Sequence, residues 1–285
     1  MMTAKILSGK DFLENEKNRL KVRVDALKAK GIDPGLGTIL VGSDRNSQSY
    51  VRLKHKACEE IGMTSHHIEL DDHATQEEVL IAINAMNANP NVNAYILQLP
   101  LPKQCNEEEA LLAIDPAKDA DGLHPVNLGK LVMGVNAPRP CTPVGIQSLL
   151  KENGVDISGK HVVIIGRGIT IGRLLANLLT LKEDGANATV TVVHTGSGDL
   201  SKYTKDADVI VAAVGVPNIV TPEMIKNGAV LVSAGMTFDE NRVLYPDISE
   251  DCLEKASFAT PRIGGVGPTT IAMLLRNTVD AAEKL

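Results

Sequence analysis

One stretch, Val162 to Leu179, constrains the fold of this chain more than any other. It reads VVIIGRGITIGRLLANLL, with four β-branched residues, then three glycines, then apolar residues at helical spacing. This order predicts a buried strand, a tight turn and a helix. Gly166 and Gly168 are expected to adopt positive φ angles, and their bare backbone would let a pyrophosphate approach the helix start near Gly172. The stretch favours a dinucleotide-binding loop.

The surroundings of the loop strengthen this interpretation, because glycines also mark ordinary turns. A buried-type strand lies immediately before the glycines and a helix immediately after them. A second strand pattern follows at Ala188 to Val193. This succession is typical of a βαβ nucleotide-binding unit.

Composition places the chain among globular α/β proteins. Its 285 residues suffice for two compact domains. Aromatic residues make up 2% and Trp is absent, so an aliphatic core is expected, as in a parallel sheet covered by helices. The net charge of −6 favours neither nucleic acid nor a membrane surface as a partner.

Targeting and metal-binding signals are not evident. The first residues, MMTAKILSGKDFLENEK, lack a signal-peptide core, and no stretch approaches a membrane span, so a cytoplasmic location is expected. The four cysteines are scattered without a C-x-x-C pair, which favours reduced structural thiols. The histidines lack metal-ligand spacing, so no metal site is expected.

The first half of the chain alternates strands and helices. Strands are predicted at residues 38–41, 66–70 and 94–98 with helices between them, which indicates a parallel sheet. A domain crossing is expected near Pro140. A last helix is predicted from Ile271, with Thr269 or Thr270 as its N-cap.

Two side chains of the first half share one helix face. Tyr50 and Lys54 are four residues apart, a spacing also found in the dyad of short-chain dehydrogenases. That dyad follows the nucleotide loop, whereas this pair precedes it. Without further support, a half-buried ring beside a solvated ammonium is the simpler interpretation. Gln98 lies at the predicted carboxyl end of a strand, where ligands bind in open α/β sheets.

Two loops offer further candidate residues. Asp119 to Pro125 places two carboxylates and an imidazole in a Gly/Pro-rich loop, where Asp121 either caps a turn or binds paired N–H donors of a ligand. Gly264 to Pro268 is unusually rich in glycine. It could press bare backbone against a flat ligand or act as an interdomain hinge.

Five separated motifs resemble one family, that of the bifunctional methylenetetrahydrofolate dehydrogenase/methenyltetrahydrofolate cyclohydrolase. The resemblance covers essentially the whole chain in order. The motifs are G-x-x-x-x-S-x-x-Y-V-x-x-K-x-K from Gly42 to Lys56, Gln98-Leu99-Pro100-Leu101-Pro102, Asp119 to Pro125, Pro140-Cys141-Thr142-Pro143, and Gly264-Gly265-Val266-Gly267-Pro268.

The resemblance implies hydride transfer from 5,10-methylenetetrahydrofolate to NADP, then hydration of the methenyl cation to 10-formyltetrahydrofolate. Tyr50 would stack on the folate, Lys54 would be the central catalytic residue, Gln98 its hydrogen-bonding neighbour, and Asp121 the pterin anchor. A lysine beside a cationic carbon is discouraged from staying protonated, so its pKa should fall and the amine could activate water.

The resemblance also implies the domain organisation. Residues 1–140 plus 269–285 would form an N-terminal α/β folate-site domain, and residues 141–268 a Rossmann NADP-binding domain, with the folate site in the cleft between them. Gly264, Gly265 and Pro268 are further candidate substrate-binding residues. A homodimer is likewise implied.

The nucleotide half departs from the usual family pattern. A G-R-S turn is replaced by Gly166-Arg167-Gly168, and D-V-G-I-N by Ser233-Ala234-Gly235-Met236-Thr237. After the second strand no carboxylate occurs before Asp199, which removes repulsion against a 2′-phosphate. NADP is therefore expected over NAD. The candidate cofactor-binding residues are Gly166, Arg167, Gly168, Gly172, Thr195 and Ser197.

Two other functions stay open on the sequence. One is a monofunctional methylenetetrahydrofolate dehydrogenase, although retention of Lys54 and Gln98 speaks against it, since hydration needs a base near the methenyl carbon. The other is a non-catalytic, nucleotide-responsive binding module, in which the altered loop no longer supports turnover.

Overall fold

A computed structural model of the chain describes residues 4–240 and 243–284. Its contacts divide these residues into two compact units. Residues through Leu13 and Thr142–Thr270 form one, and Glu14–Cys141 with the residues from Ile271 onward form the other. We call them the six-stranded unit and the three-stranded unit after their main sheets.

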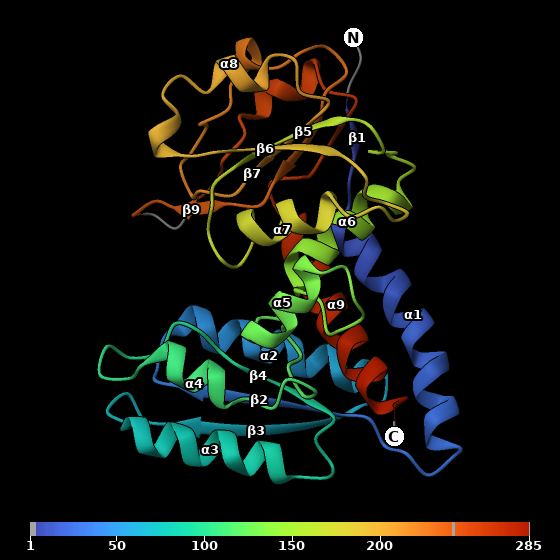
Figure 1. Cartoon of the computed structure of the whole chain (residues 1–285), viewed down its shortest axis with the longest axis vertical. Helices are drawn as coiled ribbons and strands as arrows, with labels where there is room; N and C mark the ends of the chain where they lie inside the picture. The colour runs from blue at the N-terminus through green and yellow to red at the C-terminus, as the bar shows by residue number, and fades with distance from the viewer. Residues whose placement is uncertain (1–3, 241–242, 285) are drawn as a thin grey trace. The chain divides into compact units, whose positions relative to one another are not determined.

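The six-stranded unit contains a fully parallel sheet with the order β1-β11-β8-β7-β5-β6 (Figure 1). A separate antiparallel pair joins β9 (Met236–Phe238) to β10 (Leu244–Pro246). The strands of the parallel sheet are β1 (Lys5–Ile6), β5 (His161–Ile165), β6 (Thr189–Val193), β7 (Val209–Ala212), β8 (Val230–Ser233) and β11 (Phe258–Ala259).

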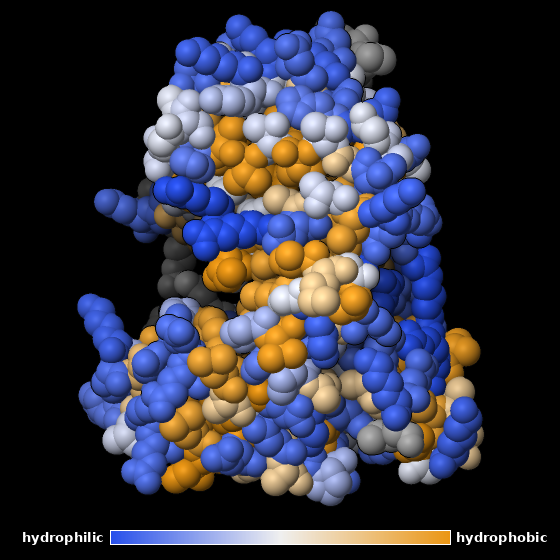
Figure 2. All heavy atoms as spheres, viewed as in Figure 1, coloured by the Kyte–Doolittle hydropathy of each residue, from blue (hydrophilic) through white to orange (hydrophobic). Residues whose placement is uncertain are grey.

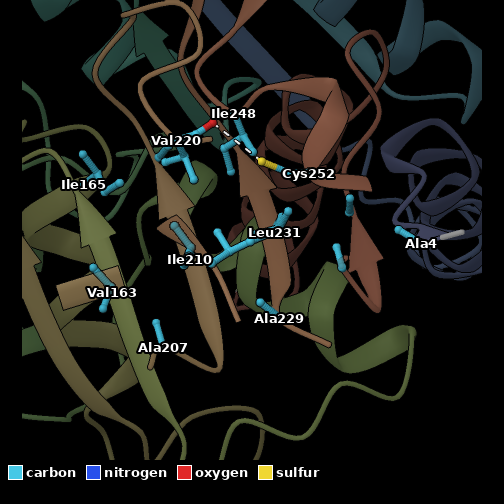
Figure 3. Close-up of a cluster of buried hydrophobic side chains, with 14 of the residues drawn as sticks. Ala4, Val163, Ile165, Ala207, Ile210, Val220, Ala229, Leu231, Ile248 and Cys252 are labelled. Carbon is cyan, nitrogen blue, oxygen red and sulfur yellow. Dashed lines mark hydrogen bonds between the residues drawn. The ribbon is translucent and has the colours of Figure 1, made fainter. Parts of the chain in front are cut away.

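The core of this unit explains its aliphatic strands. Side chains of β5, β7 and β8, among them Val163, Ile210 and Leu231, converge in one buried cluster (Figure 3). The Cys252 thiol lies in the same cluster and donates to the carbonyl oxygen of Val220 at 3.7 Å. Central parallel strands are covered on both faces, so they carry continuous apolar runs instead of alternating ones.

The strand order defines where a ligand can bind. β5 lies between β6 and β7, so the chain leaves β5 on one side and returns on the other. In open α/β sheets, such a reversal opens a crevice at the carboxyl ends of the two diverging strands. The loops after β5 and β7 border that crevice.

The three-stranded unit holds a parallel sheet of β3 (Thr64–Leu70), β2 (Gly35–Val41) and β4 (Ala94–Leu97). Ile39 and Val41 of β2 point to the face covered by α3 (Gln76–Ala88). The helix α2 (Arg45–Glu60) covers the other face (Figure 1). This alternation positions the carboxyl end of β4 and the middle of α2 beside each other.

Other helices complete the two units. Two ion pairs join α1 to α9 and to the residue directly after it. Arg276 Nε lies 2.7 Å from Glu16 Oε1, and Arg23 Nη2 lies 2.7 Å from Glu283 Oε2. The remaining α-helices are α1 (Gly9–Lys28), α4 (Glu107–Ala113), α5 (Pro125–Val132), α6 (Cys141–Glu152), α7 (Gly172–Leu179), α8 (Ser201–Thr204) and α9 (Val266–Ala282).

The start of α9 corrects one prediction. The helix begins at Val266, so neither Thr269 nor Thr270 is its N-cap. The Thr269 hydroxyl instead donates to the Val266 carbonyl at 2.8 Å, inside the helix. Pro268 is accommodated because the first turn of a helix needs no intrahelical N–H donor.

The surface is mixed in polarity. Hydrophilic residues cover the region around α8, whereas hydrophobic and hydrophilic residues are mixed in the region of α3 and α4 (Figure 2). Ile81 of α3 and Leu112 of α4 are exposed apolar residues. Within the described ranges, no helix combines the length and the apolar character that a bilayer crossing requires.

Candidate functional site

Lys54 lies on α2, one helical turn after Tyr50. The helix start is fixed by Asp44, whose carboxylate accepts from the Ser47 N–H at 2.7 Å. The Lys54 Nζ lies 4.5 Å from the centroid of the Tyr50 ring, and the Lys54 side chain is only 3% exposed. The ammonium is therefore not solvated, and the simpler interpretation of this pair is wrong.

Gln98 brings a second polar group to Lys54. It follows β4, and its Oε1 accepts from Lys54 Nζ at 3.1 Å. Its Nε2 donates to the Leu99 carbonyl at 2.8 Å, which fixes the orientation of the amide. Gln98 is thus held with its carbonyl oxygen toward the amine.

Burial changes the acidity of Lys54. Desolvation lowers the pKa of its amine, and the attraction of the Asp121 carboxylate opposes this only in part. An amine with a lowered pKa is neutral in a larger fraction of molecules near pH 7. It can then accept a proton from water, which an ordinary lysine rarely does.

The two aspartates of the next loop have different surroundings. Asp119 is buried, and its carboxylate accepts from the backbone N–H groups of Gly122, Leu123 and His124 and from Asn127 Nδ2, at 2.8–3.2 Å. These four donors make it the support of the loop. His124 in turn caps α5, because its Nδ1 accepts from the Val126 N–H at 3.1 Å.

Asp121 is half-buried, and its carboxylate has no hydrogen-bond donor within the described ranges. Desolvation raises the pKa of the carboxyl, and the attraction of Lys54 lowers it again in part. Asp121 therefore keeps its acceptor oxygens available for a ligand, whereas those of Asp119 are occupied.

A glycine turn follows β5 in the six-stranded unit. Gly166 has a φ of +116°, and a Cβ there would lie 2.5 Å from the Ala213 carbonyl oxygen. A Cβ on Gly172 would lie 2.2 Å from the Gly166 carbonyl oxygen. Both positions therefore require glycine. Gly168 has no positive φ, and a Cβ there would meet nothing within 4 Å, so the predicted positive φ at Gly168 is wrong.

The helix after this turn presents its N-terminus without a side-chain cap. Ile171 occupies the N-cap position of α7 and makes no capping hydrogen bond. The Arg173 N–H donates to the Gly168 carbonyl at 3.2 Å. Among the described residues, this leaves the N–H groups of Gly172 and Leu174 available to an anion. Arg167 in the turn is exposed and makes no ion pair with any described residue.

Polar side chains follow β6. Thr195 is exposed, and the Ser197 hydroxyl accepts from the His194 N–H at 2.9 Å. The carboxylate of Asp199 accepts from the Ser201 N–H at 3.0 Å. Hydrogen bonds from the Ser201 hydroxyl and from this N–H lower the pKa of Asp199. The first carboxylate after β6 is thus engaged locally.

The glycine-rich stretch before α9 packs against the start of α1. A Cβ on Gly9 would lie 1.7 Å from the Gly265 carbonyl oxygen, and the Lys10 N–H donates to the Gly264 carbonyl at 3.2 Å. Gly264 has a φ of +82°, and Pro268 lies in the first turn of α9. The close packing of this stretch against the start of α1 therefore explains part of its glycine content.

Comparison with known proteins assigns both halves of the chain. Residues 7–121 match the family described as "Tetrahydrofolate dehydrogenase/cyclohydrolase, catalytic domain", and residues 140–285 match its "NAD(P)-binding domain". The chain belongs to the tetrahydrofolate dehydrogenase/cyclohydrolase family. This membership confirms the predicted class of two α/β domains with a Rossmann-like second domain.

Relatives in the tetrahydrofolate dehydrogenase/cyclohydrolase family match along their whole length. The bifunctional protein FolD of Syntrophotalea carbinolica is 53% identical over 99% of this chain and 97% of its own. The crystal structure of the Campylobacter jejuni bifunctional FolD enzyme has a TM-score of 0.95 at 41% identity and covers 99% of both chains. The Trypanosoma brucei enzyme, solved with NADP cofactor and an inhibitor, has a TM-score of 0.94 at 36% identity, covering 100% of this chain and 99% of its own.

In this member of the tetrahydrofolate dehydrogenase/cyclohydrolase family, the predicted site residues fall into two groups. Tyr50, Lys54, Gln98 and Asp121 belong to the three-stranded unit, where the first three are in contact. The other candidates all belong to the six-stranded unit, namely Gly166, Arg167, Gly168, Gly172, Thr195, Ser197, Gly264, Gly265 and Pro268.

Sequence reasoning missed the contacts of two residues with the Asp119–Asp121 loop, those of Cys141 and of Asn277. The buried Cys141 thiol donates to the Ala120 carbonyl at 3.2 Å, and burial raises its pKa well above the usual value, so it stays neutral. Asn277 of α9 donates to the same carbonyl at 2.9 Å and to that of Arg139 at 3.0 Å. The P-C-T-P motif was a signal for Cys141, whereas nothing local marked Asn277.

Proposed function

We propose that this chain oxidises 5,10-methylenetetrahydrofolate to 5,10-methenyltetrahydrofolate with NADP and then hydrolyses the product to 10-formyltetrahydrofolate. The observation that carries the proposal is the buried Lys54 amine, held between the Tyr50 ring and the Gln98 carbonyl oxygen. The bifunctional relatives, which match end to end, support the same activity.

The hydrolytic step needs a base beside the methenyl carbon. As water attacks that carbon, the neutral Nζ of Lys54 accepts one of its protons and becomes an ammonium. Gln98 Oε1 accepts a hydrogen bond from this ammonium, while Tyr50 supplies a flat ring for the pterin. Asp121 accepts N–H donors of the pterin and sets its orientation.

The six-stranded unit fits a dinucleotide. The close approaches at Gly166 and Gly172 leave bare backbone, and the uncapped start of α7 supplies N–H groups for a pyrophosphate. NADP bound there would supply the hydride acceptor for the oxidation of the methylene carbon. Arg167, Thr195 and Ser197 are the groups that would receive its 2′-phosphate, since the Asp199 carboxylate is engaged by Ser201.

Assays with one protein preparation test the proposal. Methylenetetrahydrofolate and NADP should give reduced cofactor and transient methenyl absorbance that decays to the formyl product. Methenyl absorbance without decay would indicate a monofunctional dehydrogenase, and NADP binding without reduction would indicate a binding module. A faster initial rate with NAD than with NADP at equal concentration would overturn the cofactor assignment.

Gly168→Ser should strengthen NADP binding, lowering the KM for NADP about three- to fivefold. The position has ordinary backbone geometry and open space, so a serine hydroxyl can join the phosphate site as one further hydrogen bond worth about 1 kcal/mol. Gly166→Ser is the matched control, because its φ of +116° and the nearby Ala213 carbonyl exclude a side chain. A higher KM in Gly168→Ser would contradict the proposed phosphate site.

The proposal extends to the organisation of the protein. Folate binding is assigned to residues 1–140 plus 269–285, of which the described residues through Leu13 pack with the six-stranded unit. Gly264, Gly265 and Pro268 would lie next to the substrate, and NADP binding is assigned to residues 141–268. A cytoplasmic homodimer is part of the same proposal.

A further inference from the structure

One buried aspartate holds the loop that follows β7. Asp247, directly after β10, is fully buried. Its Oδ2 accepts from the Val214 N–H at 2.8 Å and the Gly215 N–H at 3.2 Å, and its Oδ1 accepts from the Val216 N–H at 2.9 Å. A single carboxylate therefore fixes three consecutive backbone groups. Hydrogen bonds to a charged acceptor are stronger than those between neutral groups.

Two hydroxyl groups complete this arrangement. The Thr237 Oγ1 of β9 donates to the Gly215 carbonyl at 2.6 Å, and the Ser233 Oγ at the end of β8 accepts from the Asp247 N–H at 3.1 Å. We call Asp247, Thr237 and Ser233 the loop clamp. The packing is tight, because a Cβ on Gly235 would lie 2.0 Å from Asp247 Oδ2.

The clamped loop borders the crevice between β5 and β7. A Cβ on Gly166 would lie 2.5 Å from the Ala213 carbonyl oxygen and 3.1 Å from Val214 Cγ1, so this loop is the wall that faces the glycine turn. Val214 and Val216 keep exposed apolar side chains there, 36% and 46% accessible. Such a wall suits the uncharged, planar part of a dinucleotide, while the start of α7 suits its phosphates.

We propose that the loop clamp positions the Val214–Val216 loop for NADP capture, with Asp247 as a positioning residue that does not itself touch the cofactor. The inference rests on the proposed function and deepens it. Ser233 and Thr237 lie in the segment where this chain departs from the usual D-V-G-I-N pattern. In this chain the hydroxyls of Ser233 and Thr237 make the contacts that hold the wall.

A purely structural role makes a different prediction. If the clamp only stabilised the six-stranded unit, its loss would lower the melting temperature without a selective effect on NADP. Methenyltetrahydrofolate hydrolysis consumes no NADP, and Lys54 and Gln98 belong to the three-stranded unit. That reaction is therefore an internal standard for an intact protein.

The test measures the Kd of NADP by calorimetry, the KM for NADP and the rate of hydrolysis in Asp247→Asn, Thr237→Val and Thr237→Ser. Asp247→Asn places an NH₂ group against N–H donors and should raise Kd and KM at least tenfold. Thr237→Val loses one hydrogen bond and should raise them about fivefold, and Thr237→Ser should bind NADP more tightly than Thr237→Val. Hydrolysis should stay within twofold in all three.

Asp251→Asn, an exposed aspartate of the same unit, is the matched control. An unchanged Kd in both Asp247→Asn and Thr237→Val would overturn the inference, and so would an equal rise in Asp251→Asn or equal values for Thr237→Val and Thr237→Ser. If Asp247→Asn does not fold, the comparison of the NADP Kd between Thr237→Val and Thr237→Ser tests the inference. A wild-type protein that binds NADP without reducing it would refute the proposed function. The Kd values of the variants would still test whether the loop clamp contributes to NADP binding.

Discussion

Replacing Lys54 with methionine should reduce methenyltetrahydrofolate hydrolysis by about 10²–10⁴-fold, the usual contribution of general base catalysis. Methionine has a similar length and is apolar, so it fits a position that is 3% exposed. Gln98 has no basic atom and does not replace the amine. Hydride transfer to NADP needs no base and should keep a much larger fraction of its rate.

The fold of Lys54→Met should survive for an electrostatic reason. Burial lowers the pKa of Lys54 below its unfolded value, so the unfolded chain binds more protons between the two pKa values. The folded state is thus penalised at pH values below the unfolded pKa, and stability rises with pH through that window. Methionine removes the penalty, so the melting temperature near pH 7 should not fall.

Lys56→Met is the matched control, because its side chain lies on the same helix and is 72% exposed. It should leave hydrolysis unchanged. Lys54→Met protein that melts normally and hydrolyses methenyltetrahydrofolate within tenfold of the wild type would refute the proposed base. In the wild type, the rate should fall as pH drops through a pKa below the ordinary lysine value of about 10.4.

Local patterns predicted much of this fold. The β5 strand, the glycine turn and α7 follow from β-branched residues, glycines and helical spacing within one continuous stretch. Tyr50 and Lys54 share a face because of helix geometry alone. By contrast, β1 and β11 have only two residues each, too few to show the alternation that predicts a strand. They pair with each other although they lie at opposite ends of the sequence.

The roles of several residues in the candidate site could not be predicted, because they depend on contacts that no local sequence pattern encodes. Asp119 and Asp121 look alike in sequence. Only the structure shows that backbone N–H groups of the loop donate to the Asp119 carboxylate, whereas Asp121 keeps its acceptor oxygens available for a ligand. Asn277 contacts Ala120 and Cys141, which lie 157 and 136 residues before it in the sequence. The geometry of Gly168 was mispredicted because the G-x-G spacing does not say which glycine bends the backbone.

Asp121→Asn should raise the KM for the folate substrate about 10- to 100-fold in both reactions, while the Kd of NADP stays unchanged. The carboxylate has two acceptor oxygens, whereas the amide keeps one and places a donor against the pterin N–H groups. A hydrogen bond to a charged group is worth about 1.5–3 kcal/mol, which corresponds to this range. Steady-state kinetics with both folates measures the change.

The pH dependence of hydrolysis distinguishes the loss of the Asp121 carboxylate from a general loss of folded protein. Asp121 raises the pKa of Lys54 by attraction, so Asp121→Asn should lower that pKa further and move the acid limb of hydrolysis to lower pH. Asp119→Asn is the contrasting variant, because its four donors lose their charged acceptor and the free energy of unfolding should fall by about 2–4 kcal/mol. An Asp121→Asn protein with wild-type KM values and an unmoved limb would remove Asp121 from the folate site, because neither its charge nor its acceptor oxygens would then be acting on the substrate or on Lys54.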